Sequence, residues 1–238
     1  MPAPSISVMI GVYNAAPYLG EAIESALGQT PAPIEVIVVD DGSTDGSGDV
    51  ARAYGDAVTV ARQENAGNGS ARNHAVRLAS GDLFAFLDAD DRFTPNKLEL
   101  QSRALEADPE LDLVFGHVRE FVSTELTTEQ RALVRPPAPE PVAWTAPNLM
   151  LVRRTSFTKV GPFAEDLRVG VTVDWYARAI DAGLSAVTLP DVLLRRRLHG
   201  ANLSRTVASR QDYLRVLKGA LDRRRGSTQP AAPPPPEA

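Results

Sequence analysis

The chain has 238 residues, with 25 Lys and Arg against 30 Asp and Glu, a formal net charge of −5. This length suits one sizeable domain, and the acidic balance excludes a generally basic nucleic-acid-binding protein. The absence of cysteine excludes a disulfide scaffold, a thiolate metal site and a cysteine nucleophile. Residues 1–4 lead into an apolar segment without a signal-peptide pattern, and no apolar run approaches the ~20 residues that cross a bilayer. We therefore expect a soluble, cytoplasmic, single-domain protein.

Short apolar runs alternate with segments of helical periodicity through the first 115 residues. The runs that predict strands are 5–11, 34–39, 58–60, 83–87 and 111–115. The segments that predict helices are 14–27, 43–54, 71–79 and 95–107. This alternation predicts an α/β fold, a doubly wound and mostly parallel central sheet with flanking helices.

The composition changes after this region. Five prolines fall between Pro136 and Pro147, so we interpret residues 123–147 as a long surface excursion. The elements predicted beyond it are a strand at 148–153, a helix at 173–182, a strand at 184–189 and a basic amphipathic helix at 207–225. Residues 226–238 hold five more prolines and almost no hydrophobic residues, which predicts a disordered tail.

Unusual residues follow three of the predicted strands. They are Val12, Tyr13 and Asn14 after the first strand, Asp40 and Asp41 after the second, and Asp88, Ala89, Asp90 and Asp91 after the fourth. Ligands of open α/β sheets bind at the carboxyl ends of the strands, near the point where the strand order reverses. We therefore expect a site that reads a base and ribose and holds a cation.

Asp88 and Asp90 form the most specific of these clusters. Two carboxylates offer hard oxygen ligands to Mn²⁺ or Mg²⁺, ions that bind partly through substrate phosphates. A metal held there could stabilise a departing diphosphate. The alternative is that Asp90 and Asp91 cap the helix beginning near Thr94, which does not account for Asp88 directly after the apolar run.

Four segments carry a resemblance to a known family, and they are 7–14 (SVMIGVYN), 38–45 (VVDDGSTD), 65–73 (NAGNGSARN) and 86–91 (FLDADD). A looser fifth match is 159–163, followed by the helix with Asp174 and by Arg197-Leu-His199. Over about residues 5–205 the chain resembles the family 2 glycosyltransferases, which have the GT-A (Rossmann-like) nucleotide-diphospho-sugar transferase fold. The resemblance implies an inverting, hexosyltransferase-type enzyme that uses a nucleotide-sugar, most often a UDP-sugar. It also implies one GT-A domain over 1–225, with a nucleotide-sugar-binding half (1–118) and an acceptor half (119–225).

The resemblance gives donor-site roles to Val12, Tyr13, Asn14, Asp40, Asp41, Arg72, Asp88 and Ala89. Tyr13 would stack on the base, and Asp40 or Asp41 would accept a hydrogen bond from the base or ribose. Turn formation is the alternative for the two aspartates, and an exposed helical arginine is the alternative for Arg72. Asp88 would touch the ribose.

Asp90 would bind the metal, and His199 would complete the metal shell or contact the diphosphate. The guanidiniums of residues 195–197 suit phosphate oxygens, whereas the alternative for His199 is a purely structural histidine. One departure from the family is Gly11, which stands where proline or threonine is usual and which we expect to loosen a turn.

The acceptor base departs further from the family, which commonly has Glu-Asp before this helix. Here Val171 and Thr172 stand in place of that pair, and a threonine hydroxyl is not basic near neutral pH. Asp174 is the remaining carboxylate, so either it acts as the base from a shifted register or the protein is catalytically weakened. The alternative for Asp174 is a helix N-terminal carboxylate favoured by the macrodipole. Glu165 and Asp166 are less suited substitutes.

Two other functions remain open. A sugar-phosphate nucleotidyltransferase would need a basic loop to cradle a triphosphate, and residues 12–17 contain no Lys or Arg. A nucleotide-sugar-binding or scaffold protein without a base would explain Val171 and Thr172. The expected partners are the donor and a saccharide, lipid-linked or other hydroxyl acceptor, with no nucleic acid and at most peripheral membrane association.

Overall fold

The computed structural model describes residues 3–167, 170–200 and 218–219. The strands are β1 (Ile6–Val12), β2 (Glu35–Asp40), β3 (Thr59–Arg62), β4 (Leu83–Asp88), β5 (Arg92–Phe93), β6 (Leu113–Val122), β7 (Val142–Trp144), β8 (Leu151–Arg153) and β9 (Ala186–Leu198). The α-helices are α1 (Ala16–Leu27), α2 (Ser47–Arg52), α3 (Asn68–Leu78), α4 (Lys97–Ala107), α5 (Thr128–Ala132), α6 (Arg154–Val160) and α7 (Val171–Asp181), and the 3₁₀ turns are η1 (Gly55–Ala57) and η2 (Pro147–Leu149). The basic helix predicted at 207–225 and the predicted disordered tail lie outside the described residues, apart from 218–219.

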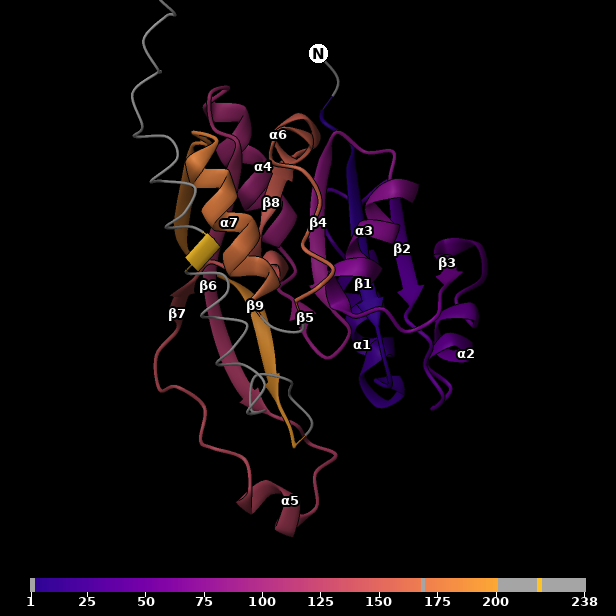
Figure 1. The fold of residues 1–238 in the computed structure, drawn as a ribbon. Coiled ribbons are helices and arrows are strands. Elements are labelled where there is room, and N and C mark those ends of the chain that lie inside the picture. Colours follow the sequence, from indigo (N-terminus) through magenta and orange to yellow (C-terminus); the bar gives the residue numbers. More distant parts are fainter. Residues whose placement is uncertain (1–2, 168–169, 201–217, 220–238) are drawn as a thin grey trace, which may run out of the picture.

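Within the described residues the strands form one nine-stranded sheet in the order β3-β2-β1-β4-β8-β6-β9-β5, with β7 added beside β6. The first four strands pair in parallel, as predicted. β1 and β2 are almost continuously buried because helices cover both faces of this part of the sheet. The α/β class is therefore confirmed, and Figure 1 shows this parallel part in indigo and purple, apart from the later elements.

The later half of the sheet is mixed, while most of the paired positions in the whole sheet are parallel, as predicted. β8 is antiparallel to both β4 and β6, β5 is antiparallel to β9, and β7 is antiparallel to β6. β6 and β9 form a long parallel pair that extends beyond the rest of the sheet, and α5 lies past its end (Figure 1). The strand predicted at 184–189 therefore continues to Leu198, because β6 supplies a partner along its whole length.

The excursion predicted at 123–147 contains two short ordered elements. Helix α5 begins at a capping box, in which the Thr127 side chain accepts from the Gln130 backbone and the Gln130 side chain accepts from the Thr127 backbone. β7 then returns the chain to β6, and its three residues are exposed. These elements escape a periodicity search because they contain only five and three residues.

Helices α1 and α3 position the carboxyl ends of the parallel strands. α1 buries Leu19, Ala22, Ile23 and Ala26 at helical spacing and carries Pro17 in its first turn. α3 packs against β1 and β2. Gly11 lies within β1, where an added Cβ would be 3.3 Å from the Ala71 Cβ. The expectation that Gly11 loosens a turn is wrong, since this glycine instead allows α3 to approach the strand closely.

Candidate active site

The three residue clusters predicted at strand ends meet at one edge of the sheet. In the strand register Val12 lies opposite Asp40, and Gly11 lies opposite Asp88. The connections leaving β1 and entering β4 run in opposite directions along the sheet, so β1 and β4 flank the point where the strand order reverses. The topology therefore places the candidate site where open α/β sheets bind ligands.

Asp88 is held from two sides at the end of β4. Its Oδ1 lies 2.5 Å from Arg72 Nη2, and its Oδ2 accepts a hydrogen bond from Asn148 Nδ2 at 3.0 Å. Arg72 is buried, with its guanidinium over the Phe163 ring at 5.7 Å, so the interpretation of Arg72 as an exposed helical residue is wrong. The ion pair fixes the Asp88 carboxylate at the strand end.

Asn148 is a site residue that the sequence reasoning missed. Its Nδ2 also donates to Asp91 Oδ2 at 2.8 Å, so one amide bridges two carboxylates. Asn148 lies in η2, just before the buried β8, and its Oδ1 is buried with no hydrogen-bond partner among the described residues. The available signal was a polar residue beside an apolar run, which is too common to identify a contact with residues 57 to 60 positions away.

Asp91 faces the interior. Burial and the neighbouring Asp90 and Asp88 charges raise the pKa of Asp91 well above its ordinary value. Its Oδ1 accepts from the Arg197 backbone N–H at 2.9 Å. Helix α4 begins at Lys97 without a side-chain cap, so the alternative in which the aspartates cap this helix is wrong.

Asp90 and His199 are brought together from the two halves of the chain. His199 Nε2 lies 2.9 Å from Asp90 Oδ2, and the His199 ring packs against Tyr18 with centroids 4.8 Å apart. The carboxylate oxygen suits Mn²⁺ or Mg²⁺, and the imidazole nitrogen adds a donor of the kind that transition-metal ions accept. The described residues contain no group of three or more His, Asp or Glu arranged to hold a metal. A metal here would therefore take its other ligands from phosphate and water.

The three residues Val12, Tyr13 and Asn14 at the end of β1 differ in their exposure and in their contacts. Val12 is buried, whereas Tyr13 is 53% exposed and offers an aromatic face at the site. Asn14 has φ of 50° and joins the loop after β1 to the one after β2: its backbone N–H donates to Ser43 Oγ at 3.0 Å, and its Oδ1 accepts from the Thr44 N–H at 2.9 Å. Asn14 thus organises two loops, while Tyr13 is available to a ligand.

Asp40 and Asp41 are both buried and build the loop after β2. Asp40 accepts from the Ser43 N–H at 2.8 Å and pairs with Arg62 at 2.7 Å. Asp41 accepts from the backbone N–H groups of Ala66 and Gly67, both at 2.9 Å. These bonds agree with turn formation, and contact with a base or ribose stays a prediction. A hollow of about 500 Å³ adjoins them, lined by Gly42, Arg62, Gln63, Glu64 and Asn65.

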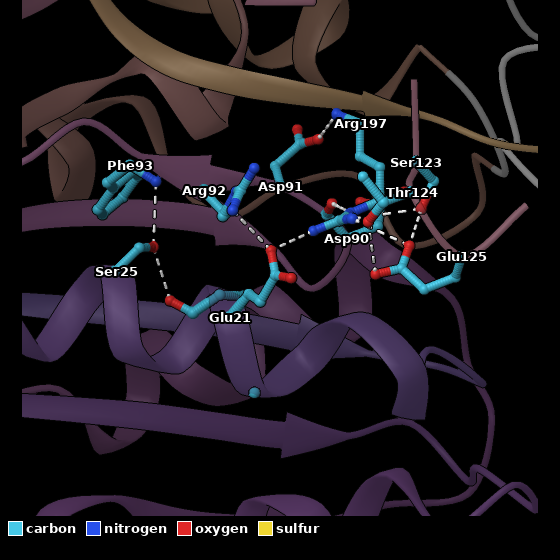
Figure 2. Close-up of polar contacts among 12 residues, drawn as sticks. Glu21, Ser25, Asp90, Asp91, Arg92, Phe93, Ser123, Thr124, Glu125 and Arg197 are labelled. Carbon is cyan, nitrogen blue, oxygen red and sulfur yellow. Dashed lines mark hydrogen bonds and ion pairs between the residues drawn. The ribbon is translucent and has the colours of Figure 1, made fainter. Parts of the chain in front are cut away.

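Two of the three arginines at residues 195–197 form ion pairs with glutamates of the chain. Arg197 is 1% exposed and lies 2.5 Å from Glu21 Oε2 (Figure 2). Arg196 pairs with Glu120 at 3.0 Å and covers the Trp144 ring. The expectation that these guanidiniums serve phosphate oxygens is therefore wrong for Arg196 and Arg197. Arg195 lies on the same side of β9 as Arg197, because residues two apart on a strand share a face, but it is exposed, with its guanidinium carbon 5.5 Å from the Phe121 ring centroid.

Asp174 lies in the first turn of α7. Its Oδ2 accepts from Arg178 Nε at 2.9 Å, and Arg178 also donates to the carbonyls of Val160 and Pro162. The next residue, Trp175, is buried and stacks on Phe157, so it belongs to the core. The part of Asp174 as acceptor base stays a prediction.

Residues 7–163 match the model of a family described as Glycosyl transferase family 2. The chain belongs to glycosyl transferase family 2. An uncharacterized glycosyltransferase of Rickettsia typhi is 31% identical over 92% of this chain and 72% of its own length. Another from Nostoc sp. is 34% identical over 86% of this chain and 68% of its own length.

Solved structures support the fold of this family 2 glycosyltransferase. S. aureus TarS 1–349 in complex with UDP-GlcNAc has a TM-score of 0.73 at 21% identity, covering 92% of this chain and 66% of that one. The mannosyltransferase PcManGT from Pyrobaculum calidifontis, in complex with GDP-Man and Mn²⁺, has a TM-score of 0.67 at 21% identity, covering 97% of this chain and 66% of that one. The GT-A fold is thus confirmed. The glycosyltransferase spans 39% of a longer TarS chain and about two thirds of the shorter solved chains.

None of the helices in the described part of this glycosyltransferase combines the length and apolar character that a membrane span requires.

Proposed function

We propose that this glycosyltransferase transfers a sugar from a UDP-sugar to a hydroxyl acceptor with inversion, using Mn²⁺ or Mg²⁺. The observation that carries the proposal is the pairing of Asp90 with His199 at the carboxyl edge of the sheet, 2.9 Å apart and beside the Asp88–Arg72 ion pair. The UDP, UDP-GlcNAc and GDP-Man complexes of similar structures support a nucleotide-sugar donor, with UDP as the first candidate.

The chain's own residues would divide the binding of the donor. Tyr13 would stack on the base, and the loop built by Asn14, Asp40 and Asp41 would surround the base and ribose. Asp88, kept in place by Arg72, would accept a hydrogen bond from a ribose hydroxyl, with Ala89 bringing the chain round to Asp90. Asp90 and His199 would hold the metal, which neutralises charge on the departing diphosphate when bound.

The transfer needs a base on the acceptor side. The acceptor oxygen forms a bond to the anomeric carbon as the bond from that carbon to the diphosphate breaks, and the acceptor proton passes to a carboxylate. Asp174 is our candidate for this carboxylate. The Arg178 guanidinium forms an ion pair with the Asp174 carboxylate. Catalysis by Asp174 would require that one of its carboxylate oxygens stays accessible to the acceptor.

A catalytically weakened nucleotide-sugar-binding protein is the second candidate. It is favoured by Val171 and Thr172 in the first turn of α7 and by the Asp174–Arg178 pair, which also suits a purely structural carboxylate. The family match sets aside the nucleotidyltransferase alternative.

A screen of nucleotide-sugars for Mn²⁺-dependent donor hydrolysis separates the two candidates. We expect the wild type to hydrolyse a UDP-sugar, Asp174→Asn to lose turnover while still binding UDP, and the exposed Asp181→Asn in the same helix to behave as wild type. Full turnover by Asp174→Asn would remove Asp174 as the base. Wild-type binding of UDP with no turnover of any donor would favour the weakened protein.

A further inference from the structure

Arg197 joins β9 to three other parts of the chain, one of which is the turn that carries Asp90. It lies near the end of β9 and is almost completely buried. Figure 2 shows its side chain between Glu21 of α1, the 90–91 turn and the segment with Ser123 and Glu125. No part of the proposed reaction uses this buried guanidinium, so its position needs a different explanation.

Two bonds join Arg197 directly to the 90–91 turn. Its Nε donates to the Asp90 carbonyl at 3.0 Å, and its backbone N–H donates to Asp91 Oδ1 at 2.9 Å. One residue thus holds the turn through both its side chain and its main chain. These bonds fix the backbone of Asp90 while leaving the Asp90 carboxylate to other partners.

Arg197 is also linked to His199, through its place in the chain and through the ring of Tyr18. Residues two apart on an extended chain point to the same side, so fixing Arg197 also directs His199 toward the turn. The Tyr18 ring contacts both, with the Arg197 guanidinium 4.8 Å from its centroid and the His199 ring centroid at the same distance. Arg197 therefore contacts the backbone of Asp90 and shares the Tyr18 ring with His199.

The remaining contacts hold the guanidinium itself. Arg197 Nη2 lies 2.5 Å from Glu21 Oε2, and Nη1 lies 3.2 Å from Ser123 Oγ and 3.4 Å from Glu125 Oε2. Phe121 packs against it, with the guanidinium carbon 4.8 Å from the ring centroid. A buried cation requires such partners, and a planar guanidinium reaches them in several fixed directions at once, which an ammonium cannot do.

We infer that Arg197 is a positioning residue that fixes Asp90 and His199 for the metal, rather than a ligand of the diphosphate. This inference rests on the metal site of the proposed function. Mutating a residue that hydrogen-bonds and orients a metal ligand typically lowers the metal affinity by about 10- to 100-fold. Arg197→Lys keeps the positive charge but cannot make the several hydrogen bonds of the guanidinium at once. It therefore tests whether these bonds position Asp90 and His199, and not whether the charge is needed.

The test is calorimetric titration of Mn²⁺ into the full chain at saturating UDP, with thermal unfolding as the check on folding. We expect Arg197→Lys to bind Mn²⁺ about tenfold more weakly or worse, while the exposed Arg195→Lys matches the wild type. UDP binding in EDTA should be equal in all three proteins. Wild-type Mn²⁺ affinity in a folded Arg197→Lys would overturn the inference. So would weaker UDP binding in EDTA, which would indicate direct contact with the diphosphate.

If Arg197→Lys does not fold, the Mn²⁺ affinity of Glu21→Gln tests the same inference. This substitution leaves Arg197 in place but removes the charge opposite Nη2, so we expect weaker Mn²⁺ affinity here too, and an unchanged affinity would overturn the inference. A wild type that binds UDP without any dependence on Mn²⁺ would instead refute the metal site of the proposed function, and this inference with it.

Discussion

Replacing Lys97 with methionine should remove part of the pH dependence of this protein's stability. Lys97, at the start of α4, is completely buried, with its Nζ near Gln101 Oε1 and the Leu149 carbonyl and 4.6 Å from the Phe93 ring centroid. Burial lowers the pKa of Lys97 to about 7. The cause is the loss of water around the ammonium, since neither of these hydrogen-bond partners carries a charge.

The magnitude follows from proton binding in the two states. An unfolded lysine keeps its proton to about pH 10.4, whereas folded Lys97 releases it near pH 7, so the unfolded state binds more protons between these values. The free energy of unfolding must then rise with pH over this interval. At about 1.4 kcal/mol per pH unit, burying Lys97 costs about 4 kcal/mol at pH 7 and about 2 kcal/mol at pH 9. Between pH 7 and pH 9 the free energy of unfolding of the wild type should therefore rise by about 2 kcal/mol because of this residue.

The assay is urea unfolding at pH 7 and pH 9, at constant ionic strength, followed by circular dichroism. The gain between the two pH values should be about 2 kcal/mol larger for the wild type than for Lys97→Met, because all other titrating groups are shared. Lys159→Met, at an exposed position of α6, should keep the wild-type gain. Equal gains in the wild type and Lys97→Met would refute the reasoning, because Lys97 would then hold its proton equally in both states.

Three further substitutions test the packing around the site by urea unfolding. Asn148→Ala should lower the free energy of unfolding by about 1–3 kcal/mol, because it leaves the buried Asp91 oxygen and the partly buried Asp88 oxygen without their donor, and an unchanged value would argue against that contact. Gly69→Ala should cost about 1–3 kcal/mol, because the new Cβ would lie 2.3 Å from the Ala164 carbonyl oxygen; a neutral result would contradict this close approach. Gly20→Ala, inside α1 with ordinary contact distances, should instead stabilise the protein by about 0.5–1 kcal/mol, and a loss of stability would count against the packing described for α1.

The parallel half of the fold and its strand-end clusters could be predicted because local signals suffice there. Each buried strand is an apolar run, and its polar cluster follows without a gap. The family resemblance added the pairing of Asp90 with His199, which no local pattern reveals across 109 positions.

The rest depends on contacts that sequence patterns do not encode. A run of three arginines looks like a solvated or phosphate-binding segment, yet Phe121 and Glu21 draw Arg197 into the interior. The three arginines also interrupt the apolar pattern, so the second half of β9 was not predicted as a strand. Asn148 was missed because its two carboxylate partners are distant in sequence.

Thermal unfolding with UDP, in Mn²⁺ and in EDTA, tests most directly the claim that Asp90 and His199 complete a metal-dependent donor site. UDP at 100 times its dissociation constant should stabilise the wild type by about 2.7 kcal/mol in Mn²⁺. Most of this stabilisation should disappear in EDTA, and Asp90→Ala should show the smaller value under both conditions. No stabilisation by UDP, or an equal one with and without metal, would contradict the account.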